Sequence, residues 1–428
     1  QKSNPEPKGT GLTAYETMPL GTMATMTFDP GDPAYLAAPY PVLARLREQD
    51  PVHWNDVLEA WFVTRYAGVR EGLRDPRLSS DRVRPFFEAQ PDGARRALAP
   101  LEANVSRWAV FVDPPRHTRL RALMSHAFTS RAVERLRSSV ASRVEELLAP
   151  LAARDEFDLI GDFAWPLPAG VIADLLGVPR EDVPRLKDWS DELSGFVFSG
   201  RNVQAKYERA ARGVAGMAEY FARLIEAKRA RPDEGLISAL VSATDGGERL
   251  TAEELEAMCV LLLFAGHETT THLIGNGMLA LLQQPSALAE LHARRGDPVF
   301  VECAVEELLR YDGPSIAQGR VAAEEFEIGG RRIRRQDRVF LMQGAANRDP
   351  RHFEAPDVLM LDRNPNAHVA FGFGIHFCVG APLARLEGNL AFPRLLGRFP
   401  RLELATAPEW QDSLVIRGAS RIPLRVVR

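Results

Sequence analysis

The chain has 428 residues, of which 45% are hydrophobic and 26% charged, and its formal net charge at pH 7 is −4. This is the composition of an ordinary globular protein with one large domain or two to three smaller ones. The charge balance lacks the basic excess of most nucleic-acid-binding proteins, so we expect no nucleic-acid partner. The longest apolar runs, such as 260–265 and 278–282, are far too short to span a membrane.

The start of the chain lacks sustained periodicity. Residues 1–26 are rich in Gly, Pro, Thr and Lys, and we predict a loose N-terminal extension followed by a single folded domain over 27–428. We expect no signal peptide at the start of the chain. Cys259 and Cys303 fall in helical patterns and are predicted core residues. The chain has three cysteines, and this low number suits a reducing compartment. We therefore expect a cytoplasmic monomer with no membrane partner.

Short elements are predicted at the start of this domain. An amphipathic helix over 41–49 precedes two strands at 52–54 and 60–64, and a second helix covers 66–73. Residues 79–104 are rich in Arg, Pro and Gly with weak periodicity, which predicts a long loop. A loop of this length inside a compact domain is usually functional or mobile.

A helix is predicted to begin at Asp113-Pro114-Pro115, because proline is favoured in the first turn. His117 and Arg121 lie four residues apart on it and therefore share a face. By themselves they would be interpreted as a solvated basic face. Helical periodicity then predicts four further helices, over 132–151, 166–176, 182–198 and 204–231.

The longest helical pattern covers 251–284. Thr251 and Glu254 form a capping box at its start, and Pro285 ends it. A helix of this length is about 50 Å long. Its middle is apolar nearly all round, so it is predicted to cross the core.

The middle of this helix, 265–270, reads Ala-Gly-His-Glu-Thr-Thr. A carboxylate and two hydroxyl groups in an apolar stretch are costly unless they are partnered. Gly266 weakens the helix here, and threonine hydroxyls compete for backbone hydrogen bonds. We predict a local opening of the helix that holds water.

A zinc site is not expected on this helix. His267, Glu268 and His272 resemble the zinc-protease pattern His-Glu-x-x-His, but the second histidine is displaced by one residue. At i and i+5 the two histidines point about 140° apart. The preferred interpretation is two ordinary surface or hydrogen-bonded histidines.

The last third of the chain mixes helices with short strands. The predicted elements are helices over 286–293, 300–311 and 381–398, a strand-rich stretch over 321–340 with a turn at Gly329-Gly330, a turn over 346–350, and short strands from Leu402 with a tip at Leu414-Val415.

Residues 371–380 read Phe-Gly-Phe-Gly-Ile-His-Phe-Cys-Val-Gly and directly precede a predicted helix. The glycines let a flat group approach the main chain, and the phenylalanines make an apolar pocket. Cys378 lies before a helix N-terminus, which favours an anion and lowers a thiol pKa. A lone thiolate is a poor zinc site, because structural zinc takes four ligands, but it is a good axial ligand to haem iron. The alternative is a buried structural cysteine.

The spacing Phe371-x-x-Gly374-x-His376-x-Cys378-x-Gly380 resembles the haem-binding signature of the cytochrome P450 family, and three further motifs match in the right order. The resemblance covers about 27–428. It implies a mainly α fold with a smaller β region, in which the haem lies between the long helix and the cysteine loop.

Within this resemblance Cys378 is the proximal ligand of the iron of haem b, and Ala265 lies beside the haem. The family also has a mobile helical lid, which the link at 200–202 would suit. The haem propionates would receive charge-assisted hydrogen bonds from four residues: His117, Arg121, Arg320 and His376.

Glu307 and Arg310 share a helix face at i and i+3, which alone indicates a surface ion pair. In the family this pair is buried and joined by a later arginine, for which Arg363 is the match. Such a triad would fix the architecture near the cysteine loop. Met360 stands where the family often has Asp, so the chain departs from the pattern there.

The implied activity is that of a haem-thiolate monooxygenase, which inserts one oxygen atom of O₂ into a C–H or C=C bond. Thr269 would donate a hydrogen bond to dioxygen, Glu268 would relay protons from water, and Gly266 would leave room for O₂. Electrons would come from NAD(P)H through a reductase and a separate ferredoxin or flavodoxin, because the chain has no four-cysteine pattern and no reductase-sized extension. Such partners are acidic, and Arg119 and Arg385 are candidates for docking them.

Two other functions stay open. A peroxide-driven haem-thiolate peroxygenase usually lacks the acid–threonine pair that Glu268 and Thr269 supply here. A non-enzymatic haem-thiolate sensor or gas carrier would more often carry a second axial ligand and a signalling domain.

The substrate is expected to be an apolar molecule of moderate or large size, such as a polyketide, a terpenoid or a fatty acid. Each candidate for the pocket wall could equally be an ordinary core residue. The candidates are Phe86, Phe87, Phe196, Phe198, Leu262, Ala265, Thr269, Ile316, Leu414 and Val415.

Overall fold

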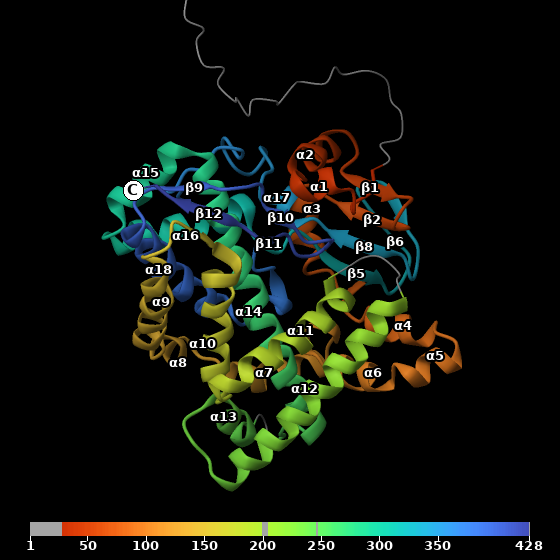
Figure 1. Cartoon of the computed structure of the whole chain (residues 1–428). Helices are drawn as coiled ribbons and strands as arrows, with labels where there is room; N and C mark the ends of the chain where they lie inside the picture. The colour runs from red at the N-terminus through yellow and green to blue at the C-terminus, as the bar shows by residue number, and fades with distance from the viewer. Residues whose placement is uncertain (1–27, 199–203, 245–246, 428) are drawn as a thin grey trace, which may run out of the picture.

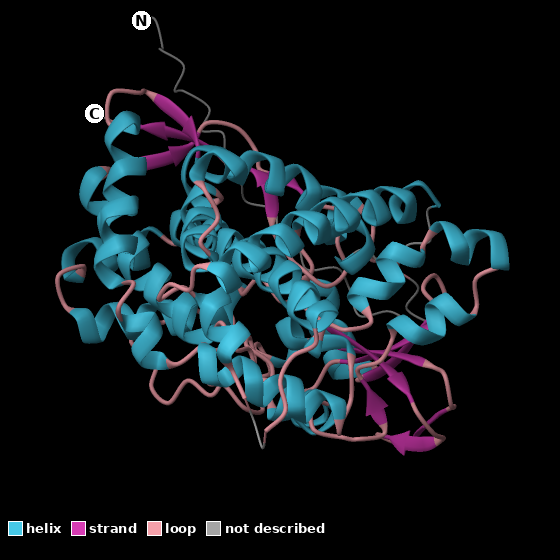
Figure 2. Ribbon diagram, turned by 90° about the horizontal axis from the view of Figure 1, so that it is seen from below, coloured by secondary structure: helices cyan, strands magenta, loops and turns pink. Residues whose placement is uncertain are grey.

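The computed structural model describes residues 28–198, 204–244 and 247–427, apart from the side chains of residues 126, 127, 130 and 204. The predicted N-terminal extension and the link at 200–202 lie outside these ranges. Helices make up most of the described chain (Figure 1), and the strands gather in separate regions at its edges (Figure 2). The predicted mainly α fold with a smaller β region is confirmed.

The helices are α1 (Pro33–Ala37), α2 (Tyr40–Gln49), α3 (Tyr66–Gly72), α4 (Val83–Glu88), α5 (Asp92–Ala97), α6 (Ala99–Val105), α7 (Arg116–Ala127), α8 (Ser130–Glu134), α9 (Arg137–Leu151), α10 (Pro166–Leu176), α11 (Val183–Phe198), α12 (Gln204–Ala230), α13 (Leu236–Ser242), α14 (Ala252–Gln283), α15 (Pro285–Arg294), α16 (Pro298–Asp312), α17 (Gln343–Ala346) and α18 (Ala381–Arg398). The strands are β1 (Val52–Asn55), β2 (Ala60–Val63), β3 (Leu78–Ser79), β4 (Glu156–Asp158), β5 (Gln318–Ala322), β6 (Phe326–Ile328), β7 (Arg331–Ile333), β8 (Arg338–Leu341), β9 (Leu402–Leu404), β10 (Glu409–Trp410), β11 (Ala419–Arg421) and β12 (Pro423–Val426).

The long helix α14 runs through the middle of the molecule (Figure 1). Its capping box is formed as predicted: the Glu254 N–H donates to Thr251 Oγ1 at 3.2 Å, and the Thr251 N–H donates to Glu254 Oε2 at 3.2 Å. Among the described helices, α14 alone is long and apolar enough to cross a membrane. However, 78% of its most apolar window is buried inside the protein, as expected of a core helix.

The two halves of α14 belong to different parts of the core. Side chains over 255–264 pack with residues of α6, α11 and α12, whereas those over 273–281 pack with residues of α9, α16 and α18. Between the two clusters, Ala265 is exposed, and Gly266, Glu268 and Thr269 are only half-buried. The polar middle of the helix therefore lies where the packing opens.

The predicted long loop over 79–104 is wrong. This stretch instead holds the short helices α4, α5 and α6. Leu98, Leu101 and Val105 are fully buried in the cluster that also contains α12. Each helix is too short to show a clear apolar period, and tertiary packing rather than local pattern stabilises it.

A five-stranded sheet with the strand order β1-β2-β8-β5-β3 lies at one edge of the helical body. The predicted strands near 52 and 60 pair as an antiparallel hairpin, and β2 then runs parallel to β8. Strand β5 pairs with β8 in a register that places Arg320 opposite Val339. This pairing carries Arg320 toward the cysteine loop.

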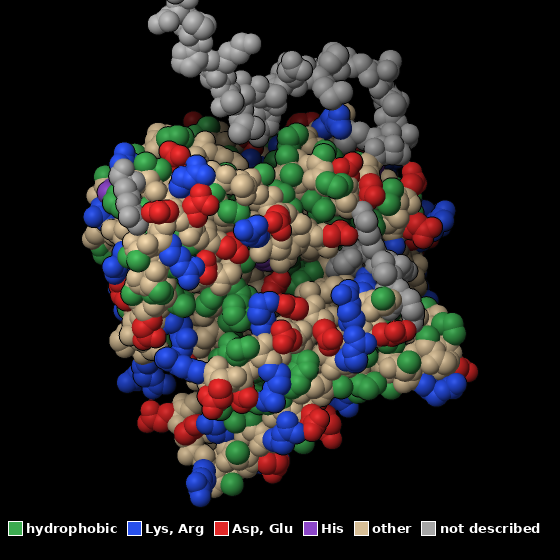
Figure 3. Space-filling view, in the orientation of Figure 1, with side chains coloured by type: hydrophobic (Ala, Val, Ile, Leu, Met, Phe, Trp, Pro, Cys, Tyr) green, Lys and Arg blue, Asp and Glu red, His purple; other side chains and the backbone are tan. Residues whose placement is uncertain are grey.

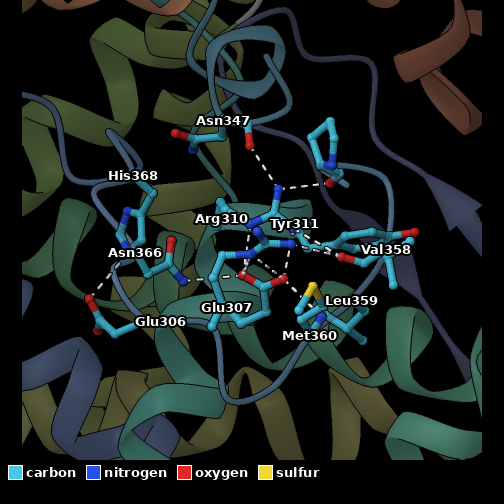
Figure 4. A network of polar contacts seen from close by, with 12 residues as sticks. Glu306, Glu307, Arg310, Tyr311, Asn347, Val358, Leu359, Met360, Asn366 and His368 are labelled. Atoms are coloured by element: carbon cyan, nitrogen blue, oxygen red, sulfur yellow. Dashed lines mark hydrogen bonds and ion pairs between the residues drawn. The ribbon is translucent and has the colours of Figure 1, made fainter. Parts of the chain in front are cut away.

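A buried polar network ties α16 to the segment that leads into the cysteine loop. Glu307 accepts hydrogen bonds from Arg310 at 2.7 Å, from Arg363 Nε at 3.0 Å and from the Met360 N–H at 3.0 Å. Figure 4 shows Glu307 at the centre, with Asn366 also donating to it. Because Met360 contributes its backbone N–H, its side chain is free to differ from the family's Asp.

Candidate functional site

A largely apolar cavity of about 250 Å³ lies between α14 and the cysteine loop. Its wall includes Cys378 together with Ala265, Gly266 and Thr269 of α14. Leu261 and Leu262 of α14 add to the apolar wall, and other elements contribute Ala109, Val110, Met124, Ile172, Leu309 and Ile416.

The cysteine loop is shaped by two glycines whose φ angles are positive, +76° at Gly372 and +77° at Gly374. Side-chain-bearing residues rarely adopt this conformation. The Cys378 N–H donates to the Phe371 carbonyl oxygen at 2.9 Å, which closes the loop just before α18 begins at Ala381. The Cys378 side chain is exposed to the cavity, whereas Cys259 is buried and Cys303 is half-buried.

The thiol of Cys378 does not behave as the helix N-terminus alone predicts. Enclosure in the apolar cavity raises its pKa. The N–H groups of Gly380 and Ala381 and the charges of Arg121 and Arg385 act in the opposite direction but do not outweigh this cost. The predicted lowering by the helix N-terminus is present, but burial raises the net pKa of the thiol, so a metal ion would have to stabilise the thiolate.

Positive and titratable side chains gather at one side of the cavity. His117, Arg121 and His376 line it, and the rings of His117 and His376 lie 4.1 Å apart. Burial, Arg320, His117 and Arg121 together lower the pKa of His376 to about 3. The buried Nδ1 of His117 has no hydrogen-bond partner among the described residues.

Two further arginines reinforce this cluster. Burial lowers the pKa of Arg320 and of Arg82 to about 10. The positive charge of Arg320 lowers the pKa of Arg82 as well. Within the described ranges, neither these arginines nor Arg121 has a carboxylate within 4.0 Å, although Asp113 lies near enough to Arg320 to oppose the shift. Arg82 was missed in the sequence, where it stands in a stretch without periodicity.

The described residues fit a large, flat, apolar group that carries two carboxylates. The apolar wall suits the body of such a group, Cys378 offers one thiolate to a central metal, and the arginine and histidine cluster lacks matching carboxylates. Haem has all three complementary features. The bound haem would then be bordered by the cavity residues Phe371, Gly380 and Ala265 and by the loop residue Gly374.

The predicted opening of α14 is not present. The helix is continuous over Ala252–Gln283, and the Thr269 hydroxyl donates to the Ala265 carbonyl oxygen at 3.3 Å. Gly266 is explained by close packing, because a Cβ at this position would lie 2.8 Å from Ile172 Cγ1. It therefore brings α10 close to α14 as well as lining the cavity.

Glu268 lies on the other side of the helix. Its carboxylate oxygens are 3.5 Å from His272 Nε2 and 3.8 Å from His267 Nε2. It lines a second, more polar cavity and not the one that contains Cys378. The structure therefore separates the two neighbours Glu268 and Thr269 that the sequence paired.

The predicted pocket residues divide into two groups. Leu262, Ala265 and Thr269 line the apolar cavity. Phe86, Phe87 and Phe196 form an aromatic cluster with Tyr207, and Phe87 is fully buried. The remaining candidates also lie outside the cavity wall: Phe198 stacks on Phe264, and Ile316, Leu414 and Val415 pack in another core cluster.

Both arginines that were predicted to dock a partner are held in ion pairs. Arg119 binds Glu254 and lies 3.4 Å from Glu248. Arg385 Nε lies 2.6 Å from Glu306 Oε1, and its guanidinium lies over the Phe371 ring at 4.7 Å. Arg385 therefore braces the cysteine loop against α16.

Comparison with known proteins decides the family. The family model described as "Cytochrome P450" matches residues 90–417. The chain belongs to the cytochrome P450 family. The polyketide biosynthesis cytochrome P450 PksS of Bacillus subtilis is 38% identical over 412 residues, which cover 94% of this chain and 99% of that protein.

Two further relatives support this assignment. The vitamin D(3) 25-hydroxylase of Pseudonocardia autotrophica is 40% identical over 95% of this chain and 98% of its own. The myxobacterial CYP267B1, solved in complex with myristic acid, superposes with a TM-score of 0.83 at 39% identity and covers 93% of this chain and 99% of that one. The chain is thus a cytochrome P450 monooxygenase, and the family implies a haem held by a cysteine thiolate.

Proposed function

We propose that this cytochrome P450 hydroxylates or epoxidises an apolar small molecule. The observation that carries the proposal is the single cavity whose wall contains both the Cys378 thiol and the Thr269 segment of α14. When bound, haem held by a thiolate would supply the activation of O₂, so that one oxygen atom enters a C–H or C=C bond.

The residues of the chain would share the work as follows. Cys378 would hold the iron of haem b, Arg121, Arg320 and Arg82 would neutralise the propionates, and His117 and His376 would donate hydrogen bonds to them. Phe371, Gly374 and Gly380 shape the loop against the flat face of the haem. Thr269 turns its hydroxyl from the Ala265 carbonyl into the cavity as a hydrogen-bond donor, and Glu268 supplies protons to that side of the helix.

The substrate class follows from the cavity wall and from the relatives. Apolar side chains such as Val110, Ile172, Leu261, Leu262 and Ile416 offer hydrophobic contact and few polar anchors. One relative is named for polyketide biosynthesis, one for vitamin D(3), and one was solved with myristic acid. We propose a polyketide, terpenoid or fatty-acid-like substrate.

We propose that the electrons come from NAD(P)H through a separate ferredoxin or flavodoxin in the cytoplasm. An acidic partner needs exposed cations near the cysteine loop, and Arg119 and Arg385 are engaged elsewhere. The exposed Arg70 and Arg74, whose guanidinium groups lie 4.3 Å and 5.5 Å from the Phe373 ring centre, meet this need. Neutralising them should weaken partner-driven turnover more than peroxide-driven turnover.

The test combines a spectrum with a labelled product. The reduced protein under carbon monoxide should show the red-shifted Soret band of thiolate-ligated haem iron. A ligand library can then be screened for shifts of the haem absorption band. With a surrogate ferredoxin, its reductase and NADPH, a bound hit should gain one oxygen atom from isotopically labelled O₂. A product whose new oxygen comes from water or from added peroxide would contradict the proposal.

A further inference from the structure

Helix α14 is the wall between two cavities of different chemistry. The apolar cavity with Cys378 lies on the side of Ala265 and Thr269. On the side of Glu268, Thr271 and His272 lies a more polar cavity of about 660 Å³. Its wall is completed by Trp165 just before α10, by Lys187, Asp191 and Ser194 of α11, by the residues 411–413 after β10, and by Ser420 of β11. Figure 3 shows the surface hollowed near the centre of this face.

Four buried polar atoms around Glu268 have no hydrogen-bond partner in the described part of the chain: Trp165 Nε1, His267 Nε2, and both ring nitrogens of His272. Buried polar groups are almost always hydrogen-bonded to protein or to ordered water. A water molecule needs a polar site with two or more partners, and this cavity offers it. It is therefore suited to bring water to the Glu268 carboxylate.

His272 is fixed in place next to this carboxylate. It is 1% exposed, and it stands one helical turn after Glu268, so the two side chains share a face. A Cβ at Gly418 would overlap the His272 ring, so the glycine makes room for an imidazole here. Nε2 of His272 lies 3.5 Å from Glu268 Oε1, at the long limit of a hydrogen bond.

The pair has other charged neighbours on each surrounding element. His267 on α14 is 3.8 Å from Glu268 Oε2, but its Nδ1 is already 2.8 Å from the Leu263 carbonyl oxygen. On α11, Lys187 forms an ion pair with Asp191. Asp412 from the segment after β10 faces the same cavity and has a partner of its own. Of the two histidines, His272 is the one that lines this cavity.

We propose that His272 is a positioning residue for proton delivery. It holds the Glu268 carboxylate at the polar cavity and releases it when the carboxyl group turns toward Thr269. This inference rests on the proposed monooxygenase function. A proton passes from cavity water to the Glu268 carboxylate, the carboxyl group turns across the helix, and the proton leaves toward the Thr269 hydroxyl. The carboxylate then returns to His272, so the relay is regenerated and no electrons move.

The electrostatics of Glu268 agree with this assignment. Burial raises its pKa, but the close approach of His272 and the charges of His267 and Lys187 lower it by more, so that the net value is about 2. Glu268 is therefore a carboxylate near neutral pH and accepts a proton only in passing.

The decisive measurement is the protonation of Glu268 itself. Infrared difference spectra of the haem-loaded full chain with isotope-labelled glutamate give the carboxyl band, and Glu268→Gln identifies it by loss. In His272→Leu the pH at which Glu268 takes up its proton should rise by about one unit or more. In His272→Gln, which keeps an uncharged donor, the rise should be smaller. His292→Leu, a histidine on α15 away from both cavities, is the matched control and should leave the band unchanged.

Turnover supplies the second readout. His272→Leu should release several-fold more hydrogen peroxide per NADPH than the parent. Peroxide-driven turnover should stay the same, because added hydrogen peroxide already carries the protons that the relay delivers to reduced dioxygen. A retained Soret band shows that each variant still folds around the haem.

The outcomes separate the two claims. An unchanged carboxyl titration and unchanged coupling in His272→Leu, with the red-shifted Soret band intact, would overturn the role of His272 alone. Absence of that band from the parent would overturn the proposed function itself.

Discussion

Glu268 and Thr269 are neighbours on α14, yet their side chains open onto different cavities. Successive residues of a helix point about 100° apart, and here this turn directs the acid into the polar cavity and the alcohol into the apolar one. Glu268 is held by His272 at 3.5 Å, and Thr269 donates to the Ala265 carbonyl oxygen. The pair can act together only if a proton is carried from one face of the helix to the other.

The first prediction concerns the haem ligand. Cys378 is the cysteine in the described chain whose side chain is exposed to the cavity. Cys378→Ala should abolish the red-shifted Soret band of the reduced, carbon-monoxide-bound protein. Cys259→Ala and Cys303→Ala should keep it, because Cys259 is buried away from the cavity and Cys303 lies on α16. A thiolate-type spectrum in Cys378→Ala would refute the assignment.

The second prediction concerns the cationic cluster. Without the Arg121 charge, the two carboxylates of the haem would be poorly paired, so Arg121→Ala should retain less haem after dialysis than the parent. Arg320→Ala and Arg82→Ala should weaken retention in the same direction. Arg84→Ala is the control, because its side chain is 68% exposed and pairs with Asp81. Haem occupancy equal to the parent would remove the arginine in question from the site.

Local patterns in the sequence were enough to predict several of these features. The capping box at Thr251 and Glu254 and the ends of α14 follow from short-range rules, and the structure agrees within one residue. The cysteine loop and the Glu307, Arg310 and Arg363 motifs were equally visible, because each depends on fixed spacings.

The features that sequence reasoning missed all depend on distant partners. Arg119 and Arg385 looked free, but their partners Glu254 and Glu306 lie on other helices. The separation of Glu268 from Thr269 depends on which element covers each face of α14. Phe87 points into the core because α4 packs there, and no local pattern shows this.

The third prediction contrasts a buried ion pair with an exposed one. Glu307 and Arg310 have fully buried side chains, so Glu307→Gln leaves two arginines without their charge partner. This should lower the free energy of unfolding by about 3–5 kcal/mol. Glu48→Gln breaks the pair with Arg351, whose side chains are 46% and 47% exposed, and should cost less than about 1 kcal/mol. Denaturant titration measures both, and equal losses would contradict the argument.

The fourth prediction concerns the effect of pH on stability. Glu387 on α18 is fully buried, both its oxygens lack hydrogen-bond partners among the described residues, and burial raises its pKa well above the usual value. In the unfolded chain the pKa of a glutamate carboxyl group is about 4.3. Above this pH the unfolded chain releases the proton of Glu387, while the folded chain keeps it. The folded state thus binds more protons, so its stability falls as pH rises toward the folded pKa.

Glu387→Gln stays neutral at every pH and should remove this loss. The difference in denaturation midpoint between the variant and the parent should therefore grow as the pH rises from about 4.5 to 8. Glu403→Gln, at an exposed position, is the control and should show no such trend. A constant difference across this range would show that Glu387 does not contribute in this way.

The last prediction tests the donor on the cavity side of α14. Thr269→Ala removes a hydroxyl that lines the apolar cavity but leaves the thiolate and the cationic cluster in place. The variant should still bind haem, substrate and O₂ and consume NADPH. It should release more hydrogen peroxide and form less product, and the loss of one positioned donor often costs about 10²-fold. Added peroxide should restore part of the activity, because it brings an O–O bond that is already reduced.

Ser242→Ala on α13 is the control, because it removes a hydroxyl with the same kind of hydrogen bond. Its hydroxyl donates to the Ser238 carbonyl oxygen at 2.8 Å and lines neither cavity, so coupling should stay close to that of the parent. If Thr269→Ala turned NADPH into product as tightly as the parent, Thr269 would not be the donor. Substrate hydroxyls or ordered water would then have to deliver the proton on this side of the helix. Peroxide-driven turnover that exceeded NADPH-driven turnover in the parent itself would favour a peroxygenase.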